Sequence, residues 1–312
     1  MPQPAKRLDL RADRLGAAIP MGSPQNYASD ADRAVIARLY RSRIEEMVRV
    51  MRGIGARTAL LTLSQNFSDW PPVVSIHRHD LRPQEKEAFQ AAVQEGDTLA
   101  PVDCTGALTA WRKAMVIDDG FADLHFKMGG CERTLGRIDD ARANFRLASD
   151  LDRFSQGAPL SFNAILRDVA EREGAILVDI DAAFTLASGD RLVGDDLFVD
   201  AMHPNLRGHQ LIAESVAEAL REEGVPVPPD RWQVGKYHNP DPDVLIAQNP
   251  ELGVKELLSR ALVCKAAGRT ACALNKLEAA KMATNDTLTR LLIEKGISTA
   301  PAPTLGLPSK AQ

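Results

Sequence analysis

Arg57-Thr-Ala-Leu-Leu-Thr-Leu63 is a short apolar run that lies between a helical pattern and a loop. Residues 28–54 place apolar side chains at helical spacing among arginines and glutamates, and Gly53 ends the pattern. After the run, Ser64-Gln-Asn-Phe-Ser-Asp-Trp-Pro-Pro72 interrupts regular structure. A helix, a buried strand and a polar loop in this order predict an α/β architecture.

A second unit of the same kind lies between residues 161 and 223. The sequence predicts, in order, a helix over 161–174, a buried strand at Ala175-Ile-Leu-Val-Asp-Ile180, a loop over 184–198 and an amphipathic helix over 211–223. In open α/β sheets the loops at strand carboxyl ends carry the functional site. Asn66 and His203 both lie downstream of such ends, so both are candidate site residues.

The stretch between the two units is alanine-rich and helical, and it repeats with a period of 34 residues. The matching pairs are Ala107 and Ala141, Trp111 and Phe145, Ala114 and Ala148, and Asp118 and Asp152. This is the period of the tetratricopeptide repeat, a helix-turn-helix unit. A third copy is predicted near the C-terminus, where Ala267-Gly-Arg, Ala273, Leu277 and Ala280 follow the second copy at an offset of 132. We expect the first two copies to dock on the α/β part and to shape access for a substrate or a partner.

Composition excludes several classes of function. The 312 residues carry a formal net charge of -4, and the basic residues are dispersed, which excludes an extended nucleic-acid surface. The N-terminus lacks the apolar run of a signal peptide and no stretch is long enough to span a membrane, so the chain as written is predicted to be cytoplasmic. Its four cysteines form no Cys-x-x-Cys motif, and we expect them to be reduced and buried.

Asp200-Ala-Met-His203-Pro204 carries the clearest catalytic pattern. An aspartate three residues before a histidine, on the turn into a helix, places a carboxylate within reach of the imidazole. Such a pair orients the ring and makes His203 a general base, with Asp200 holding its tautomer. The alternative is an ordinary surface turn before a helix.

The context of this pair resembles the last conserved block of SGNH/GDSL-type hydrolases, and the chain is similar to members in which tetratricopeptide repeats interrupt the α/β domain. The resemblance rests on Leu197-Phe-Val-Asp-Ala-Met-His-Pro204, on the loop that starts at Ser64, on Ser75-Ile-His-Arg78, on Ala164-Ile-Leu-Arg167 and on the repeats. It implies a flavodoxin-like three-layer parallel sheet, catalytic roles for Asp200 and His203, and an ester or acylated saccharide as substrate.

The chain departs from this family in one respect. SGNH enzymes begin with a strand that ends in Gly-Asp-Ser and carries the nucleophile, and the first 27 residues here contain neither. We therefore expect this chain to correspond to the later part of such a domain, with its nucleophile outside the visible motifs. Because the sequence indicates two strands, we expect a small and incomplete sheet with an exposed edge, which a partner or a missing segment covers.

Other residues are weaker candidates. Asn66 can donate to an oxyanion or a substrate, or it can form an Asx turn. Ser64 follows a strand, which suits an exposed site loop, and the resemblance to the hydrolase family places it in a substrate-side loop rather than at the nucleophile. Ser23 has no strand before it. His77-Arg-His79-Asp80 and the acids at 195, 196 and 200 fit no standard zinc spacing, so we expect neither a metal site nor a cofactor.

The predicted organisation has six parts: 1–82 and 156–224 form the α/β domain, 83–155 the repeat insertion, 225–253 a proline-rich connector, 254–295 a helical hairpin and 296–312 a disordered tail. Two functions remain open. The chain is by ancestry a hydrolase of the SGNH ester-hydrolase class, incomplete without its nucleophile, or it is a non-catalytic module that binds a protein partner through its helical repeats.

Overall fold

The computed structural model describes residues 30–298 except 156, 190, 234–240 and 267. The predicted tail beyond residue 298, Ala267, Ser23 and the rest of the first 29 residues lie outside the described part. The chain divides into two compact units, one that extends to Pro242 and one that begins at Asp243. None of the helices in the described part is long and apolar enough to cross a bilayer.

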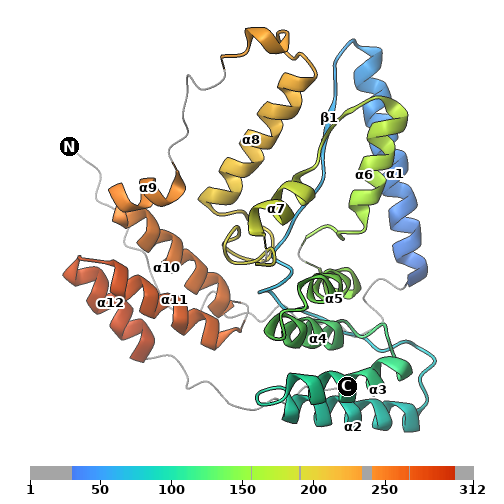
Figure 1. The fold of residues 1–312 in the computed structure, drawn as a ribbon, viewed down its shortest axis with the longest axis vertical. Coiled ribbons are helices and arrows are strands. Elements are labelled where there is room, and N and C mark those ends of the chain that lie inside the picture. Colours follow the sequence, from blue (N-terminus) through green and yellow to red (C-terminus); the bar gives the residue numbers. More distant parts are fainter. Residues whose placement is uncertain (1–29, 156, 190, 234–240, 267, 299–312) are drawn as a thin grey trace. The chain divides into compact units, whose positions relative to one another are not determined.

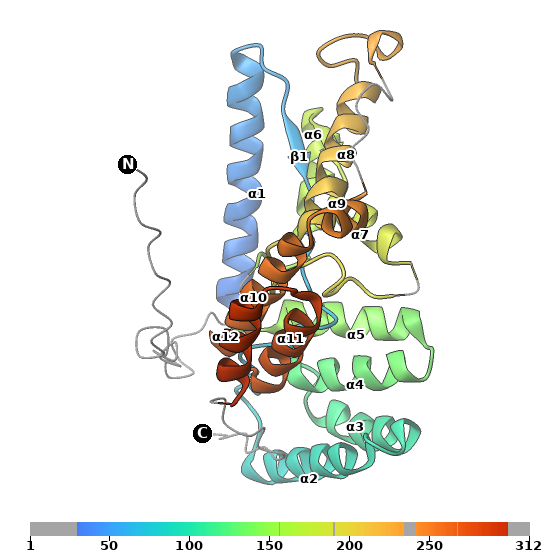
Figure 2. The ribbon, with the colours of Figure 1, turned by 90° about the vertical axis from the view of Figure 1, so that its left-hand side faces the viewer.

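The described residues of the first unit form both strands and eight helices (Figures 1 and 2). Its elements are α1 (Asp30–Gly53), β1 (Ala59–Leu61), α2 (Pro83–Leu99), α3 (Cys104–Ile117), α4 (Ala122–Thr134), α5 (Ile138–Leu151), α6 (Phe162–Glu173), β2 (Ile176–Val178), α7 (Ile180–Ser188) and α8 (Leu206–Glu222), followed by a 3-10 turn at Pro229–Arg231. The second unit contains α9 (Pro242–Gln248), α10 (Pro250–Ala266), α11 (Thr270–Ala283) and α12 (Thr287–Ser298).

The prediction of a three-layer α/β fold is wrong. Within the described residues the chain is mostly helical, with twelve α-helices and one parallel sheet of two strands. The two strands lie where the apolar runs predict them and pair from Ala59 with Ile176 to Leu61 with Val178. Each strand is three residues long. In the other described segments the apolar residues recur at helical spacing, and these segments form helices rather than further strands.

The 34-residue pattern produces two antiparallel helical hairpins, α2 with α3 and α4 with α5, which Figure 2 shows stacked in order. The repeated alanines are fully buried, and each hairpin places a glycine against the large side chain of the next helix. A Cβ on Gly96 would lie 2.2 Å from Trp111, and one on Gly129 would lie 3.0 Å from Phe145. Small residues at these positions therefore let the paired helices approach closely.

The second hairpin shares its core with the strands. Ala141 and Phe145 pack in one cluster with Phe67, Val178 and Phe184, whereas the cluster around Trp111 joins the first hairpin to α4. The helical insertion is thus continuous with the sheet through α5.

Three local predictions differ from the structure. Helix α7 occupies the beginning of the stretch predicted as a loop over 184–198, because Asp179 caps it by accepting a hydrogen bond from Ala182 N–H. Helix α9 and the start of α10 lie inside the proline-rich connector, where Pro242 and Pro250 occupy first-turn positions that tolerate proline. Up to residue 298, where the described part ends, three helices follow α9 rather than one hairpin.

The cysteine prediction is also wrong. Cys104 is bonded to Cys131, and Cys264 is bonded to Cys272. The first disulfide joins the start of α3 to the last turn of α4, which are neighbours in space but 27 residues apart in sequence. No short motif signals such a pair.

Candidate functional site

The loops that follow β1 and β2 meet at the carboxyl ends of the two parallel strands. The backbone N–H of Asn66 donates to the carbonyl of Ala201 at 2.9 Å, and that of Ser68 donates to the carbonyl of Val193 at 3.3 Å. The structure therefore brings the loop of Asn66 beside the Asp200–His203 turn.

The Asp200–His203 pair is formed. Nδ1 of His203 lies 2.6 Å from Oδ2 of Asp200, and Oδ1 of Asp200 accepts the backbone N–H groups of Met202 and His203 at 2.8 and 2.7 Å. The imidazole is 67% exposed, whereas the carboxylate is 14% exposed. An ionised carboxylate only accepts, so Nδ1 carries the proton and Nε2 is the basic atom.

The residues before and after the Asp200–His203 turn fix its position through hydrogen bonds and packing. Val199 N–H donates to the carbonyl of His203 at 2.9 Å, and Leu197 and Phe198 are buried in the core before it. After it, Asn205 caps α8 by accepting from Gly208 N–H at 2.9 Å. A Cβ on Gly208 would lie 2.5 Å from the carbonyl oxygen of Leu197, so glycine is needed where the helix begins.

The side chain of Asn66 is buried, and both its amide nitrogen and its amide oxygen make hydrogen bonds. Nδ2 donates to Oδ1 of Asp195 at 2.9 Å, and Oδ1 accepts the N–H of Asp69 at 3.1 Å. Asp69 in turn accepts from the N–H of Asp195 at 3.0 Å. The carboxamide therefore holds the two loops together, and its predicted role toward an oxyanion stays a prediction.

Ser64 is not paired with the histidine. Its Oγ is buried and makes no hydrogen bond, although the backbone of the preceding Leu63 is bonded at both N–H and C=O by Asn163. Within the described residues, Nε2 of His203 has no hydrogen-bond partner, so no serine, threonine or cysteine hydroxyl or thiol is placed there as a nucleophile.

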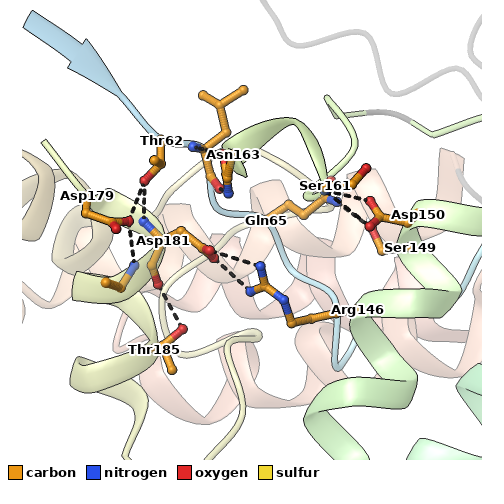
Figure 3. A network of polar contacts seen from close by, with 12 residues as sticks. Thr62, Gln65, Arg146, Ser149, Asp150, Ser161, Asn163, Asp179, Asp181 and Thr185 are labelled. Atoms are coloured by element: carbon orange, nitrogen blue, oxygen red, sulfur yellow. Dashed lines mark hydrogen bonds and ion pairs between the residues drawn. The ribbon is translucent and has the colours of Figure 1, made fainter. Parts of the chain in front are cut away.

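A polar network behind the site joins α5 to the strand ends (Figure 3). Arg146 on α5 makes two hydrogen bonds to Asp181, at 2.8 and 2.9 Å, and the hydroxyl of Thr62 donates to Asp179 at 2.8 Å. Burial opposes ionisation of Asp179, but hydrogen bonds from Arg167, Thr62 and Ala182 N–H hold its pKa below the ordinary value.

No sequence motif signals Arg146, because this residue lies 35 positions from Asp181 and on a different helix. Asp179 caps α7, the helix that follows β2.

His77, from the His77-Arg-His79-Asp80 stretch singled out in the sequence, makes structural contacts. His77 lies 2.8 Å from the buried carboxylate of Asp118 and stacks on Phe121, so its ring is used in packing. In the described part of the chain, no group of three histidines, cysteines or acids is arranged to hold a metal ion.

Comparison with protein-family models, with curated proteins and with solved structures finds no match to this chain.

Proposed function

We propose that the Asp200–His203 pair is the proton-transfer centre of a hydrolase that acts on ester bonds. The observation that carries the proposal is the 2.6 Å contact between His203 Nδ1 and Asp200 Oδ2 on a ring that is 67% exposed. This arrangement directs the proton of Nδ1 at the carboxylate and leaves Nε2 basic and open to a substrate.

In the proposed reaction, Nε2 of His203 takes a proton from a hydroxyl as that oxygen attacks the carbonyl carbon of the ester. The imidazolium then returns the proton to the departing alkoxide oxygen. Asp200 stays ionised throughout, because its role is to hold the ring and to stabilise the imidazolium. The hydroxyl belongs to water or to a serine outside the described residues.

Hydrolysis of a short-chain nitrophenyl ester tests this proposal. General base catalysis contributes about 10²- to 10⁴-fold, so His203→Ala is expected to lower kcat/KM by at least about 100-fold. His209→Ala is the matched control, because His209 is an exposed histidine on α8 outside the pair. Equal losses in both variants, or a wild-type rate no higher than that of His203→Ala, would overturn the proposal.

Binding of a protein segment by the helical hairpins is a second candidate. An open groove of about 320 Å³ favours it, lined by Arg112, Met115, Met128, Glu132, Asp140, Ala143, Asn144 and Leu147. Peptides selected from a display library against the chain are expected to lose binding to Leu147→Glu and to keep binding to Val116→Glu, since Val116 is 87% exposed and does not line the groove. Equal binding to both variants contradicts this candidate.

A further inference from the structure

A buried carboxylate lines the groove that runs along helices α3, α4 and α5, which are neighbours in the stack of hairpins (Figure 2). Met128 and Glu132 of α4 both belong to this lining, and they are 3 and 4% exposed. Burying a carboxylate costs free energy unless a charge or hydrogen bonds compensate it. The environment of Glu132 therefore indicates what the groove is suited to bind.

One oxygen of Glu132 is bonded and the other is not. Nδ2 of Asn144 donates to Oε2 at 2.8 Å, and within the described residues Oε1 has no hydrogen-bond partner. In that part of the chain, the only side-chain oxygen that is both fully buried and unbonded belongs to Ser64. Oε1 of Glu132 is therefore not sealed in the interior but accessible from the groove.

A chain of hydrogen bonds holds the carboxylate in this orientation. Oδ1 of Asn144 lies 2.8 Å from Nδ1 of His125, and Nε2 of His125 lies 2.7 Å from the carbonyl oxygen of Asp119. His125 is itself 3% exposed, so this chain is shielded from solvent. Glu132 cannot turn away from the groove without breaking the bond to Asn144.

The open oxygen has an energetic cost for the chain by itself. Burial raises the pKa of Glu132, and the charge of Asp140, which lines the same groove, acts in the same direction, although the hydrogen bond from Asn144 opposes both. The ionised form of Glu132 is therefore disfavoured. An opposite charge within about 4–6 Å favours the ionised form of a carboxyl group, so a cation at Oε1 would offset this cost.

A single open oxygen suits an ammonium group better than a guanidinium group. Arginine binds a carboxylate best through two parallel hydrogen bonds, which need both oxygens, and here Oε2 already accepts from Asn144. Lysine instead carries a compact point charge at the end of a four-carbon stem. Such a stem packs on apolar surface, which Met115, Met128 and Leu147 supply along the groove.

The size and the remaining charge of the groove restrict the partner further. Its volume of about 320 Å³ is at the lower end of the range of about 300–1,000 Å³ for ligand pockets. The groove therefore admits one or two side chains of an extended segment rather than a packed helix. Arg112 also lines it, is exposed and forms no ion pair with another described residue. It would repel a second cation, so the segment carries neutral or acidic residues beside its lysine.

We propose that the groove binds the side chain of a lysine in an extended segment of a partner protein. The ammonium group donates to Oε1 of Glu132, and the stem packs on the apolar lining. This inference rests on the second candidate function, the binding of a protein segment by the helical hairpins, and adds the residue that the groove recognises.

Peptide binding to the full chain tests the inference. Display-selected peptides that bind the wild type and lose binding to Leu147→Glu are expected to share a lysine. One such peptide is then compared, by fluorescence polarisation, with analogues that carry arginine, norleucine or Nε-acetyl-lysine at that position. Loss of a hydrogen bond between charged groups is expected to weaken binding of the two neutral analogues by at least about 10-fold. The arginine analogue is expected to bind more weakly than the lysine peptide, and equal binding overturns the selection of an ammonium group.

Glu132→Gln is the decisive variant. Its amide keeps an oxygen for Asn144 but donates where the carboxylate accepts, so it is expected to bind the lysine and norleucine peptides equally. Asp139→Asn is the matched control, because it removes one charge from α5 at a residue that is 95% exposed and does not line the groove. This control is expected to keep the preference for lysine. Equal loss of the preference in both variants would indicate general electrostatic attraction and overturn the site.

The same measurements separate this inference from the candidate function beneath it. If peptides bind in the groove but share no lysine, or if Glu132→Gln keeps the preference for lysine, the inference fails and the candidate function stands. If no peptide binds, or if binding survives Leu147→Glu, both fail.

Discussion

Replacing Arg146 with methionine removes the guanidinium that joins helix α5 to the buried carboxylate of Asp181. The side chain of Asp181 is 7% exposed and that of Arg146 is 27% exposed, so this pair is shielded from solvent. Breaking a buried pair by removing one partner destabilises a protein by about 3–5 kcal/mol. Arg167 stays 3.2 Å from Asp181 and compensates part of the charge, so we expect a loss of about 2–3 kcal/mol.

Urea unfolding followed by tryptophan fluorescence measures this loss. All three tryptophans, at 70, 111 and 232, lie in the unit that ends at Pro242, so the signal reports on the unit that contains Arg146. With an m-value of about 2–3 kcal/mol/M, the predicted loss lowers the midpoint by about 1 M.

Arg142→Met is the matched control, because it removes an arginine one turn earlier on the same helix. The partner of Arg142 is Asp139, which is 95% exposed, and an exposed pair contributes about 0–1 kcal/mol. The reasoning fails if Arg146→Met and Arg142→Met lower the midpoint by the same amount.

Three further changes probe other parts of the same unit. Asn163→Ala is expected to destabilise the chain by about 2 kcal/mol in urea unfolding, because both the N–H and the C=O of Leu63 lose their partner, and no loss would contradict this. Replacing Cys104 and Cys131 by serine is expected to lower the free energy of unfolding by about 3.5 kcal/mol, because the disulfide closes a loop of 27 residues in the unfolded chain. Thermal melts of the wild type with reductant should show a matching loss of stability. Burial raises the pKa of the Glu132 carboxyl above 4.5, so ionisation of this group lowers the stability of the fold as the pH rises from 4.5 through the folded-state pKa. Glu132→Gln removes this ionisation and should therefore melt at a higher temperature than the wild type at pH 7. The difference in melting temperature should vanish below pH 4.5.

The helical hairpins were predictable because their packing rule is local. Ala107 and Ala141 recur at one period, and each is fully buried where two helices touch. A close approach of neighbouring helices restricts residue size at fixed positions, and this restriction is visible in one sequence.

The extent of the sheet was not predictable from its strands. Leu60 pairs with Leu177, which lies 117 residues further along the chain. Strands that pair over such distances share no local sequence pattern, so the number of strands in the sheet cannot be predicted from either strand alone. A resemblance supplied the three-layer expectation, and the described chain contains two strands. The same limit hid the Cys104–Cys131 and Arg146–Asp181 pairs, whose members come from different elements.

The Asp200–His203 pair was visible because its spacing brings both side chains to one turn, yet a turn of this kind needs only Asp200. Its Oδ1 holds two backbone N–H groups whether or not a histidine is present. Asp200→Asn keeps this acceptor but replaces Oδ2 by an amide that donates, so Nδ1 of His203 must accept and Nε2 carries the proton. A catalytic role therefore predicts a fall in ester hydrolysis of up to about 10⁴-fold with a change in stability below about 1 kcal/mol. A purely structural turn predicts unchanged hydrolysis, so measuring both quantities on this one variant decides between the two roles.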